Sequence, residues 1–153
     1  MLVKRAMSKN VVSVSVPGNR EKVLDLMRKE DKAVLPVVKG DTKQLVGLIT
    51  RSDLIVNPDE EQIAILMSTD LVTASPDDDV KDVAKKMIDN NVRRVPVVDD
   101  NGDLVGIITS FDLVSNALIK LESDDPVENF MITTVPTTWY KTPLNVAFET
   151  MKQ

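Results

Sequence analysis

Two short stretches, Gly47–Asp53 and Gly106–Asp112, carry the residue types best suited to chemistry. Each begins with glycine, continues through two apolar residues to a threonine, and reaches an aspartate three positions later. We expect a strand that ends at the threonine and turns directly into a helix. The first backbone N–H groups of a helix lack partners within it, and here a hydroxyl and a carboxylate stand beside them. The pattern therefore predicts a small anion-binding site that occurs twice.

The same residues also suit structural roles. An aspartate in the first turn of a helix stabilises its dipole, and a threonine just before the turn can cap the helix. Capping and ligand binding by the threonine are compatible. Gly47 and Gly106 indicate a bulge or the close approach of another part of the chain. Because glycine, threonine and aspartate recur together, we favour a functional role for the two aspartates.

The composition removes several kinds of chemistry. The 153-residue chain contains no Cys and no His, which excludes cysteine nucleophiles, disulfides, thiolate metal sites and imidazole acid–base catalysis. Its net charge of −5 argues against nucleic acid or an anionic membrane as the main partner. Apolar runs are too short for a membrane span, and the N-terminus does not resemble a secretory signal. Carboxylate metal sites and serine, lysine or carboxylate chemistry survive this exclusion, but the chain has no activated-serine signature and no P-loop. We therefore expect a cytoplasmic protein that is not an enzyme, and we expect no metal site.

An internal repeat of about sixty residues organises the chain. Met7–Val14 resembles Met67–Ala74, and the match continues to the two motifs. A third copy begins at Met131–Thr138, and the chain ends inside the helix expected after it. The repeat predicts domains at residues 1–58 and 59–122 and the start of a truncated third domain at residues 123–153. We also expect the chain to be a fragment of a longer protein.

Each full repeat is predicted to fold as β-α-β-β-α. The predicted strands are Val11–Val16, Val34–Val38 and Leu45–Thr50 in the first repeat, and Val72–Ser75, Val95–Val98 and Leu104–Thr109 in the second. An amphipathic helix in the second repeat is indicated by one apolar stripe: Val80, Val83, Ala84, Met87 and Ile88. We expect Ser75 to cap this helix and the acidic run Asp77–Asp79 to belong to its N-terminus rather than to bind a metal.

Prolines mark further features. Pro36 and Pro96 cannot donate to a strand ladder, so each strand is expected to be an edge strand or to be interrupted there. Asn57–Glu60 predicts the start of a linker helix. The second helix of each repeat follows its motif and is stopped in the first repeat by Pro58, whereas in the second it continues to about Leu121. One repeat alone leaves apolar surface open, so we expect two repeats to pack face to face.

The order of short strand, amphipathic helix, proline-containing strand, turn and G-h-h-T-x-x-D motif (h apolar) resembles the cystathionine beta-synthase (CBS) domain. Two in tandem resemble a Bateman module. The resemblance covers Met7–Leu121, and a chain of four such domains would resemble the gamma subunit of AMP-activated protein kinase and its archaeal relatives. It implies an α+β fold of two β-α-β-β-α repeats packed sheet to sheet as a pseudo-two-fold pair, plus a partial third repeat.

The resemblance also implies a regulatory module that binds AMP, ADP, ATP or S-adenosylmethionine in two clefts. Asp53 and Asp112 would bind the ribose hydroxyls, and Thr50 and Thr109 would contact the phosphate. The base side of the Asp112 cleft would be Met7, Val12, Lys32, Ala33 and Pro36. The base side of the Asp53 cleft would be Met67, Val72, Val92, Arg93 and Pro96.

Basic residues just before the second strand reach the phosphates in gamma subunits. Arg93 and Arg94 occupy this position in the second repeat, whereas Lys32-Ala33 in the first repeat does not match. The arginines also suit a solvated pair or partners for Asp99-Asp100. We favour Asp112 as the better site because Arg94 precedes the second strand of the same repeat.

Two other functions stay open at this point. The ligand could be S-adenosylmethionine in place of a nucleotide, or the clefts could be empty and the module could serve dimerisation and protein interaction. The resemblance further implies a homodimer formed through the helices and a regulated partner such as an enzyme or a kinase. We expect no catalytic cofactor.

Overall fold

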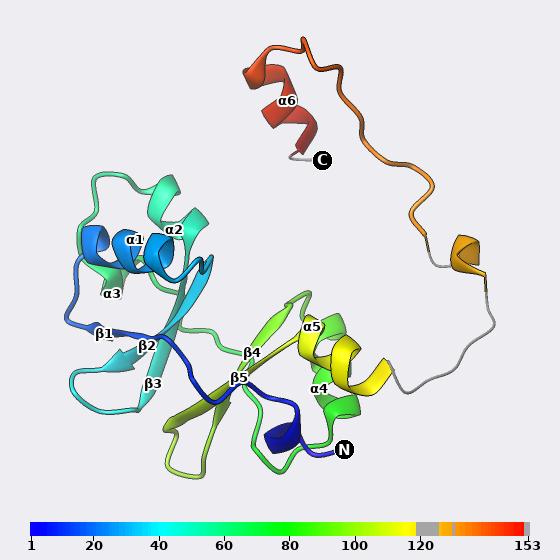
Figure 1. Ribbon diagram of the computed structural model, residues 1–153. Coiled ribbons are helices and arrows are strands. Elements are labelled where there is room, and N and C mark those ends of the chain that lie inside the picture. Colours follow the sequence, from blue (N-terminus) through cyan, green and yellow to red (C-terminus); the bar gives the residue numbers. More distant parts are fainter. Residues whose placement is uncertain (119–125, 130, 152–153) are drawn as a thin grey trace. The chain divides into compact units, whose positions relative to one another are not determined.

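The computed structural model of the chain describes residues 1–118, 126–129 and 131–151. It divides into two compact units, Met1–Leu121 and Glu122–Gln153. The first unit contains both full repeats (Figure 1). Its α+β class confirms the prediction, with both repeats built from the predicted hairpins and helices.

We call the elements of the first repeat the first half. They are β1 (Val14–Val16), α1 (Arg20–Lys29), β2 (Val34–Lys39), β3 (Leu45–Thr50) and α2 (Arg51–Val56). The sheet order is β1-β2-β3, with β1 parallel and β3 antiparallel to β2. Asn19 caps α1 by accepting a hydrogen bond from the backbone N–H of Lys22 at 3.0 Å.

The second half repeats this arrangement with a shorter sheet. Its elements are α4 (Val80–Asp89), β4 (Arg94–Val98), β5 (Leu104–Thr109), α5 (Ser110–Leu113) and the π-helical turn η2 (Val114–Leu118). The strand predicted at Val72–Ser75 is reduced to one parallel bridge between Ala74 and Val97. The continuation of the last helix to about Leu121 lies outside the described residues.

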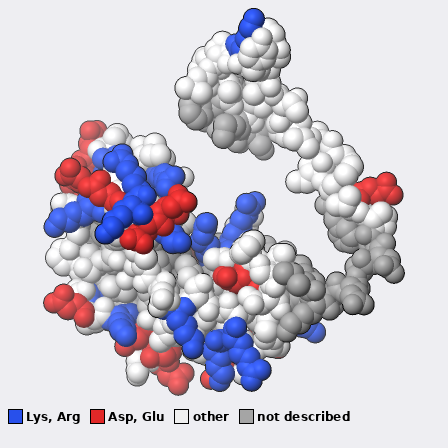
Figure 2. Space-filling view, in the orientation of Figure 1, with Lys and Arg blue, Asp and Glu red and all other residues white. Residues whose placement is uncertain are grey.

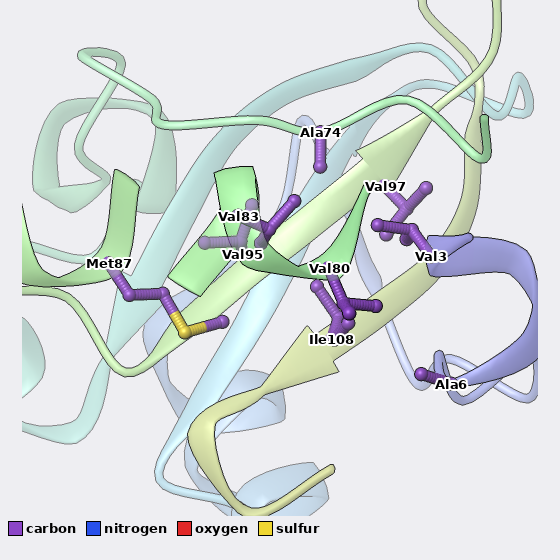
Figure 3. Close-up of a cluster of buried hydrophobic side chains, with 9 residues drawn as sticks. All are labelled: Val3, Ala6, Ala74, Val80, Val83, Met87, Val95, Val97 and Ile108. Carbon is purple, nitrogen blue, oxygen red and sulfur yellow. The ribbon is translucent and has the colours of Figure 1, made fainter. Parts of the chain in front are cut away.

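The segment before each repeat packs against the other half. The turn η1 (Val3–Arg5) contributes Val3, and Ala6 follows it into the core of the second half; Figure 3 shows this cluster, which is Val3, Ala6, Ala74, Val80, Val83, Met87, Val95, Val97 and Ile108. In the same way the short helix α3 (Ile63–Leu66) buries both its terminal residues in the core of the first half. The two halves are therefore tied together by exchanged segments.

Each exchanged segment also adds to the opposite sheet. Ser8 forms an antiparallel bridge with Ile107, and Ser68 forms one with Leu48. The chain then crosses back from Ser8 to β1, so the strand predicted from Val11 begins only at Val14. The strand is shorter than predicted because the residues between Ser8 and Val14 span the gap between the two sheets.

Pro36 lies in the central strand of its sheet, so of the two predicted alternatives, an edge strand or an interruption at the proline, the edge strand is wrong for β2. Its missing N–H is tolerated for two reasons. Leu48, opposite Pro36, exchanges its backbone hydrogen bonds with Ser68 instead, at 3.0 and 2.9 Å. On the other side, β1 pairs with β2 only from Val37 onward. The ladder therefore needs no donor at this position.

Three local predictions are wrong. Asp79, not Ser75, caps α4, because Ser75 to Asp78 form a separate turn in which the Ser75 carbonyl accepts a hydrogen bond from the Asp78 N–H. Asn57–Glu60 forms a turn, and the linker helix begins later, with Gln62 as its first flanking residue. Ile88, predicted to belong to the buried stripe of α4, is 79% exposed, so the stripe ends at Met87.

The second unit contains the turn η3 (Val127–Asn129) and the helix α6 (Leu144–Met151). The helix lies where the third copy predicts its first helix. Trp139 and Tyr140 precede it with an edge-to-face contact at 5.0 Å between ring centroids. The partial third repeat itself stays a prediction.

Alanine at Gly47 or Gly106 tests the close approach of the exchanged segments. At both positions a Cβ would lie 2.5 Å from a methionine Sδ, that of Met67 or Met7. At Gly106 the nearest atoms all belong to the flexible Met7 side chain, whereas at Gly47 the Ser68 carbonyl oxygen also lies at 3.1 Å. We expect Gly47→Ala to destabilise by about 1–3 kcal/mol and Gly106→Ala by less, measured by urea denaturation.

Combining Gly106→Ala with Met7→Ala should cost less than the sum of the two single changes, because removing the thioether makes room for the added methyl group. Equal losses at the two glycines, or strict additivity at Gly106, would contradict this account.

Asp78 generates a pH prediction. Its Oδ2 accepts hydrogen bonds from the Ser75 backbone N–H at 3.1 Å and from the Lys86 ammonium at 3.2 Å. The Ser75 bond first, and then Lys86, hold the pKa of Asp78 below its ordinary 3.8 against the opposing effect of burial. The charged carboxylate therefore stabilises the fold fully above its unfolded-state pKa, and this contribution is lost as pH falls through the lowered pKa.

We expect Asp78→Asn to lower the free energy of unfolding at neutral pH, with a difference from wild type that shrinks in acid. Denaturant titrations at a series of pH values measure it. Asp70→Asn is the control, because Asp70 is exposed and has no hydrogen bond or ion pair in the part of the chain described. If Asp78→Asn lowered the free energy of unfolding by the same amount at every pH, the stabilising role of the Asp78 charge would be contradicted.

Candidate functional site

A cavity of about 320 Å³ lies between the two halves. Its walls come from three stretches: the segment that crosses from β5 to β1, the turn between α1 and β2 with the start of β2, and the ends of β4 and β5 with the motif of the second half. The lining residues are Ser8, Asn10, Val11, Val12, Asp31, Lys32, Ala33, Val34, Leu35, Pro36, Arg94, Ile107, Thr109 and Asp112. A volume of this size suits a small organic ligand.

Asp112 and Thr109 form a closed pair at the start of α5. Asp112 Oδ2 accepts hydrogen bonds from the Thr109 backbone N–H at 2.8 Å and from its hydroxyl at 2.7 Å. The Thr109 hydroxyl in turn accepts from the Asp112 N–H at 3.1 Å. Only Oδ2 is used, so within the described structure Oδ1 of Asp112 keeps its capacity to accept hydrogen bonds from a ligand.

The pair also limits what Thr109 can do. Its hydroxyl proton is directed at Asp112, so a phosphate could receive that proton only by displacing the carboxylate. The backbone geometry is that of a capping box, which is the structural role considered for these residues. Thr50 and Asp53 form the same capping box. Asp53 Oδ2 accepts hydrogen bonds from the Thr50 backbone N–H at 2.7 Å and from the Thr50 hydroxyl at 2.8 Å, and that hydroxyl accepts one from the Asp53 N–H at 3.2 Å.

Arg94 owes its position to the β4–β5 ladder. It stands directly opposite Thr109, and opposite residues of an antiparallel pair project from the same face of the sheet. The guanidinium therefore belongs to the motif end of the cavity. In the first half Val34 stands opposite Thr50, so the Asp53 motif has no equivalent cation.

The charges around the cavity balance. Lys32 and Arg94 contribute two cations, and Asp31 and Asp112 contribute two carboxylates. Apolar surface comes from Val12, Ala33 and Pro36 on the first half. The cavity thus has one polar end that can bind hydroxyls or an anion and one apolar wall that can pack against a flat ring.

The structure brings together seven of the predicted site residues: Val12, Lys32, Ala33, Pro36, Arg94, Thr109 and Asp112. Met7, predicted for the same cleft, is not among the lining residues, and its Sδ lies against Gly106. The remaining predicted residues do not line this cavity. They are Thr50, Asp53, Met67, Val72, Val92, Arg93 and Pro96.

Each of those residues has another place in the fold. Met67 packs against Gly47, as Met7 does against Gly106. Val72 and Val92 pack against the core of the second half. Pro96 is buried in β4, and Arg93 is exposed, with its carbonyl accepting a hydrogen bond from the Ser110 N–H at 2.9 Å.

Sequence reasoning missed several lining residues, among them Ser8, Asn10 and Asp31. Asp31 had a signal, because a short polar residue just after a helix favours the left-handed conformation. It adopts φ 48°, and Asn91 adopts φ 51° at the matching place in the second half. Ser8 and Asn10 had no signal of their own, since their place depends on the exchange of segments.

On the face of the molecule drawn in Figure 2, acidic and basic side chains lie intermixed over α1 and α2. Among the described residues, no helix is long and apolar enough to cross a membrane.

Comparison with protein families gives a match to one family model, the CBS domain, at residues 3–59 and again at residues 61–118. The chain belongs to the CBS domain family. Both halves of the first unit are therefore CBS domains, and the cavity lies between the two members of a CBS pair.

Solved CBS pairs share this fold. One is the CBS domain pair of protein MJ0100 in complex with 5′-methylthioadenosine and S-adenosyl-L-methionine, which is 32% identical, with a TM-score of 0.71 over 79% of this chain and 98% of that one. Another is protein MJ1225 from Methanocaldococcus jannaschii, described as a putative archaeal homolog of g-AMPK. It is 20% identical, with a TM-score of 0.80 over 88% of this chain and 56% of that one, and shows the fold alone.

Curated relatives are longer than the matched region. Protein MK0525 of Methanopyrus kandleri is 36% identical over 85 residues, which are 51% of this chain and 43% of that protein. Inosine-5′-monophosphate dehydrogenase of Nitrosopumilus maritimus is 35% identical over 120 residues, which are 74% of this chain but only 24% of the enzyme. In both cases the matched region is less than half of the relative's own length.

The capping boxes yield a stability prediction. Replacing Thr109 or Thr50 by valine removes the hydroxyl that accepts from the aspartate N–H, so each change should cost about 1 kcal/mol. Thr69→Val is the matched control, because Thr69 is exposed and its hydroxyl has no hydrogen bond in the described structure. Chemical denaturation measures the differences, and a loss at Thr69 as large as at Thr109 would refute the assignment.

Proposed function

We propose that this CBS pair is a regulatory module that binds an adenosyl ligand in the cavity at Asp112. The observation that carries the proposal is that one cavity joins Thr109, Asp112 and Arg94 of the second half to an apolar wall from the first half. The relative of known structure that is 32% identical over most of this chain holds two adenosyl compounds. The module itself is not an enzyme in this proposal.

Each end of the cavity has a role. The unused Oδ1 of Asp112 accepts hydrogen bonds from the two ribose hydroxyls, which a carboxylate can do with two lone pairs on one oxygen. Val12, Ala33 and Pro36 pack against the adenine ring. Arg94 approaches the substituent on the ribose 5′ position, where its guanidinium can bind a phosphate.

The balance of charge disfavours a ligand with several phosphates. Two cations and two carboxylates line the cavity, so the several charges of ATP would be poorly compensated. AMP carries one phosphate, which Arg94 and Lys32 can neutralise. S-adenosylmethionine is the second candidate, because Asp31 supplies a carboxylate for its cationic part and because the MJ0100 pair is solved with it.

The two motifs are unequal in this proposal. Asp53 retains the aspartate and threonine geometry, but Val34 stands where the second half has Arg94. A phosphorylated ligand therefore binds at Asp112 in preference to Asp53. A ligand that bridges the halves can regulate an attached domain or partner only through different affinities for two arrangements of the pair.

Exposed apolar side chains support the proposed homodimer. Ile55 and Val56 of α2 are 64% and 74% exposed, and Phe111 of α5 is 75% exposed. In the repeat Ile55 corresponds to Val114, which is 48% exposed, so the second helix of each half carries exposed apolar surface where the helical contact between paired modules would form. An energy-sensing role, a cytoplasmic location and a regulated enzyme or kinase partner complete the proposal.

Calorimetric titration with AMP, ADP, ATP and S-adenosylmethionine tests the ligand and the site. We expect AMP or S-adenosylmethionine to bind most tightly and Asp112→Ala to weaken that ligand tenfold or more, because hydrogen bonds to a charged group contribute about 1.5–3 kcal/mol. Asp53→Ala is the matched control, since it removes the same capping residue from the other half. Arg94→Gln should weaken AMP more than S-adenosylmethionine.

Thermal melting of each variant confirms that it is folded. Dissociation constants above about 1 mM for all four ligands would defeat the proposal. Equal losses from Asp53→Ala and Asp112→Ala would defeat the choice of cavity.

A further inference from the structure

A second cavity, of about 310 Å³, lies on the opposite side of the crossing segment between Ser8 and β1. It is lined by Lys9, Asn10, Val11, Ser13, Val38, Thr42, Lys43 and Leu104. Successive residues of an extended chain face opposite ways. Accordingly Ser8 and Val12 line the first cavity only, and Lys9 and Ser13 line the second only, whereas Asn10 and Val11 between them line both.

Backbone hydrogen bonds fix the floor of this cavity. The Leu104 N–H donates to the Lys43 carbonyl at 2.8 Å, and the Leu45 N–H donates to the Gly102 carbonyl at 3.1 Å. These bonds join the hairpin turn of the first half to that of the second. The Thr42 hydroxyl donates to the Lys39 carbonyl at 2.6 Å and accepts from the Gln44 N–H at 3.2 Å, which holds the turn in place.

The lining is rich in donors and has no carboxylate. Lys9 and Lys43 bring two ammonium groups, and Asn10 and Ser13 bring an amide and a hydroxyl. In the described part of the chain none of these side chains forms a hydrogen bond or an ion pair, whereas Lys4 and Lys86 each pair with an aspartate. The first cavity differs, because two carboxylates balance its two cations.

Two cations at one cavity repel each other unless an anion lies between them. The free hydroxyl of Ser13, on the same face of the segment as Lys9, suits an oxygen of the same anion. We propose that this cavity is a second binding site, separate from the one at Asp112, and that it takes a small polyanion bearing phosphoryl groups. The proposal does not depend on an adenosyl ligand in the first cavity.

Titration of the whole chain with pyrophosphate at physiological ionic strength tests the site, followed by calorimetry and by amide chemical shifts. We expect saturable binding of one pyrophosphate, with shifts centred on residues 9–13 and 42–43. The double variant Lys9→Gln/Lys43→Gln should weaken the binding at least tenfold. The control is Lys22→Gln/Lys29→Gln, which removes the same charge from the exposed surface of α1 and should leave the affinity unchanged.

A third variant separates the two cavities. Arg94→Gln should leave pyrophosphate binding intact, even if it abolishes the binding of AMP. Loss of pyrophosphate binding in Arg94→Gln, an equal loss in the α1 control, or the absence of saturable binding would each overturn the proposal. Failure of all adenosyl ligands to bind would defeat the proposed function and leave this site standing.

Discussion

The exchange of segments between the two halves is the constraint on which the rest of the structure depends. Met7 and Met67 each cross to the other half and pack on a glycine in its last strand, where a larger residue would leave no room. Ser8 and Ser68 then bridge to the strand residues that follow those glycines. Because each half needs a segment of the other to complete its core, neither is expected to fold alone, and the space between them is fixed by backbone contacts.

The candidate site follows from that exchange. After its bridge to Ile107, the chain must return to β1, and the returning residues form the wall between two cavities. The first half therefore supplies the apolar wall opposite Asp112, while the second supplies the carboxylate and Arg94. The repeat makes the framework symmetric, and single differences such as Val34 against Arg94 make the chemistry unequal. The asymmetry lies in the residues beside the motifs, whereas the motifs themselves fold alike.

The sequence predicted what depends on local pattern and on repetition. The hairpins β2–β3 and β4–β5 lie at their predicted bounds within a residue, since apolar strands around a turn indicate them directly. The capping of α4 was wrong, because the acidic run offers several acceptors and the turn at Ser75 decides among them. β2 is not an edge strand because β1 pairs with it in parallel, a contact between segments that are distant in the sequence. Ser8, Lys9 and Asn10 belong to the repeated stretch, but the repeat does not indicate a cavity, and only the crossing of the chain brings them to one.

The two cavities also show how structural and ligand-binding demands share residues. Asp112 uses one oxygen to cap α5 and keeps the other for a ligand, so a loss of binding on its removal has to be separated from a loss of the cap. Asp53 makes the same cap without Arg94 nearby, which is why it is the natural reference for that separation. Lys9 and Lys43 have no such structural bond in the described residues. Their ammonium groups are therefore available to a bound anion, and the lining of that cavity contains no carboxylate that would compete for them.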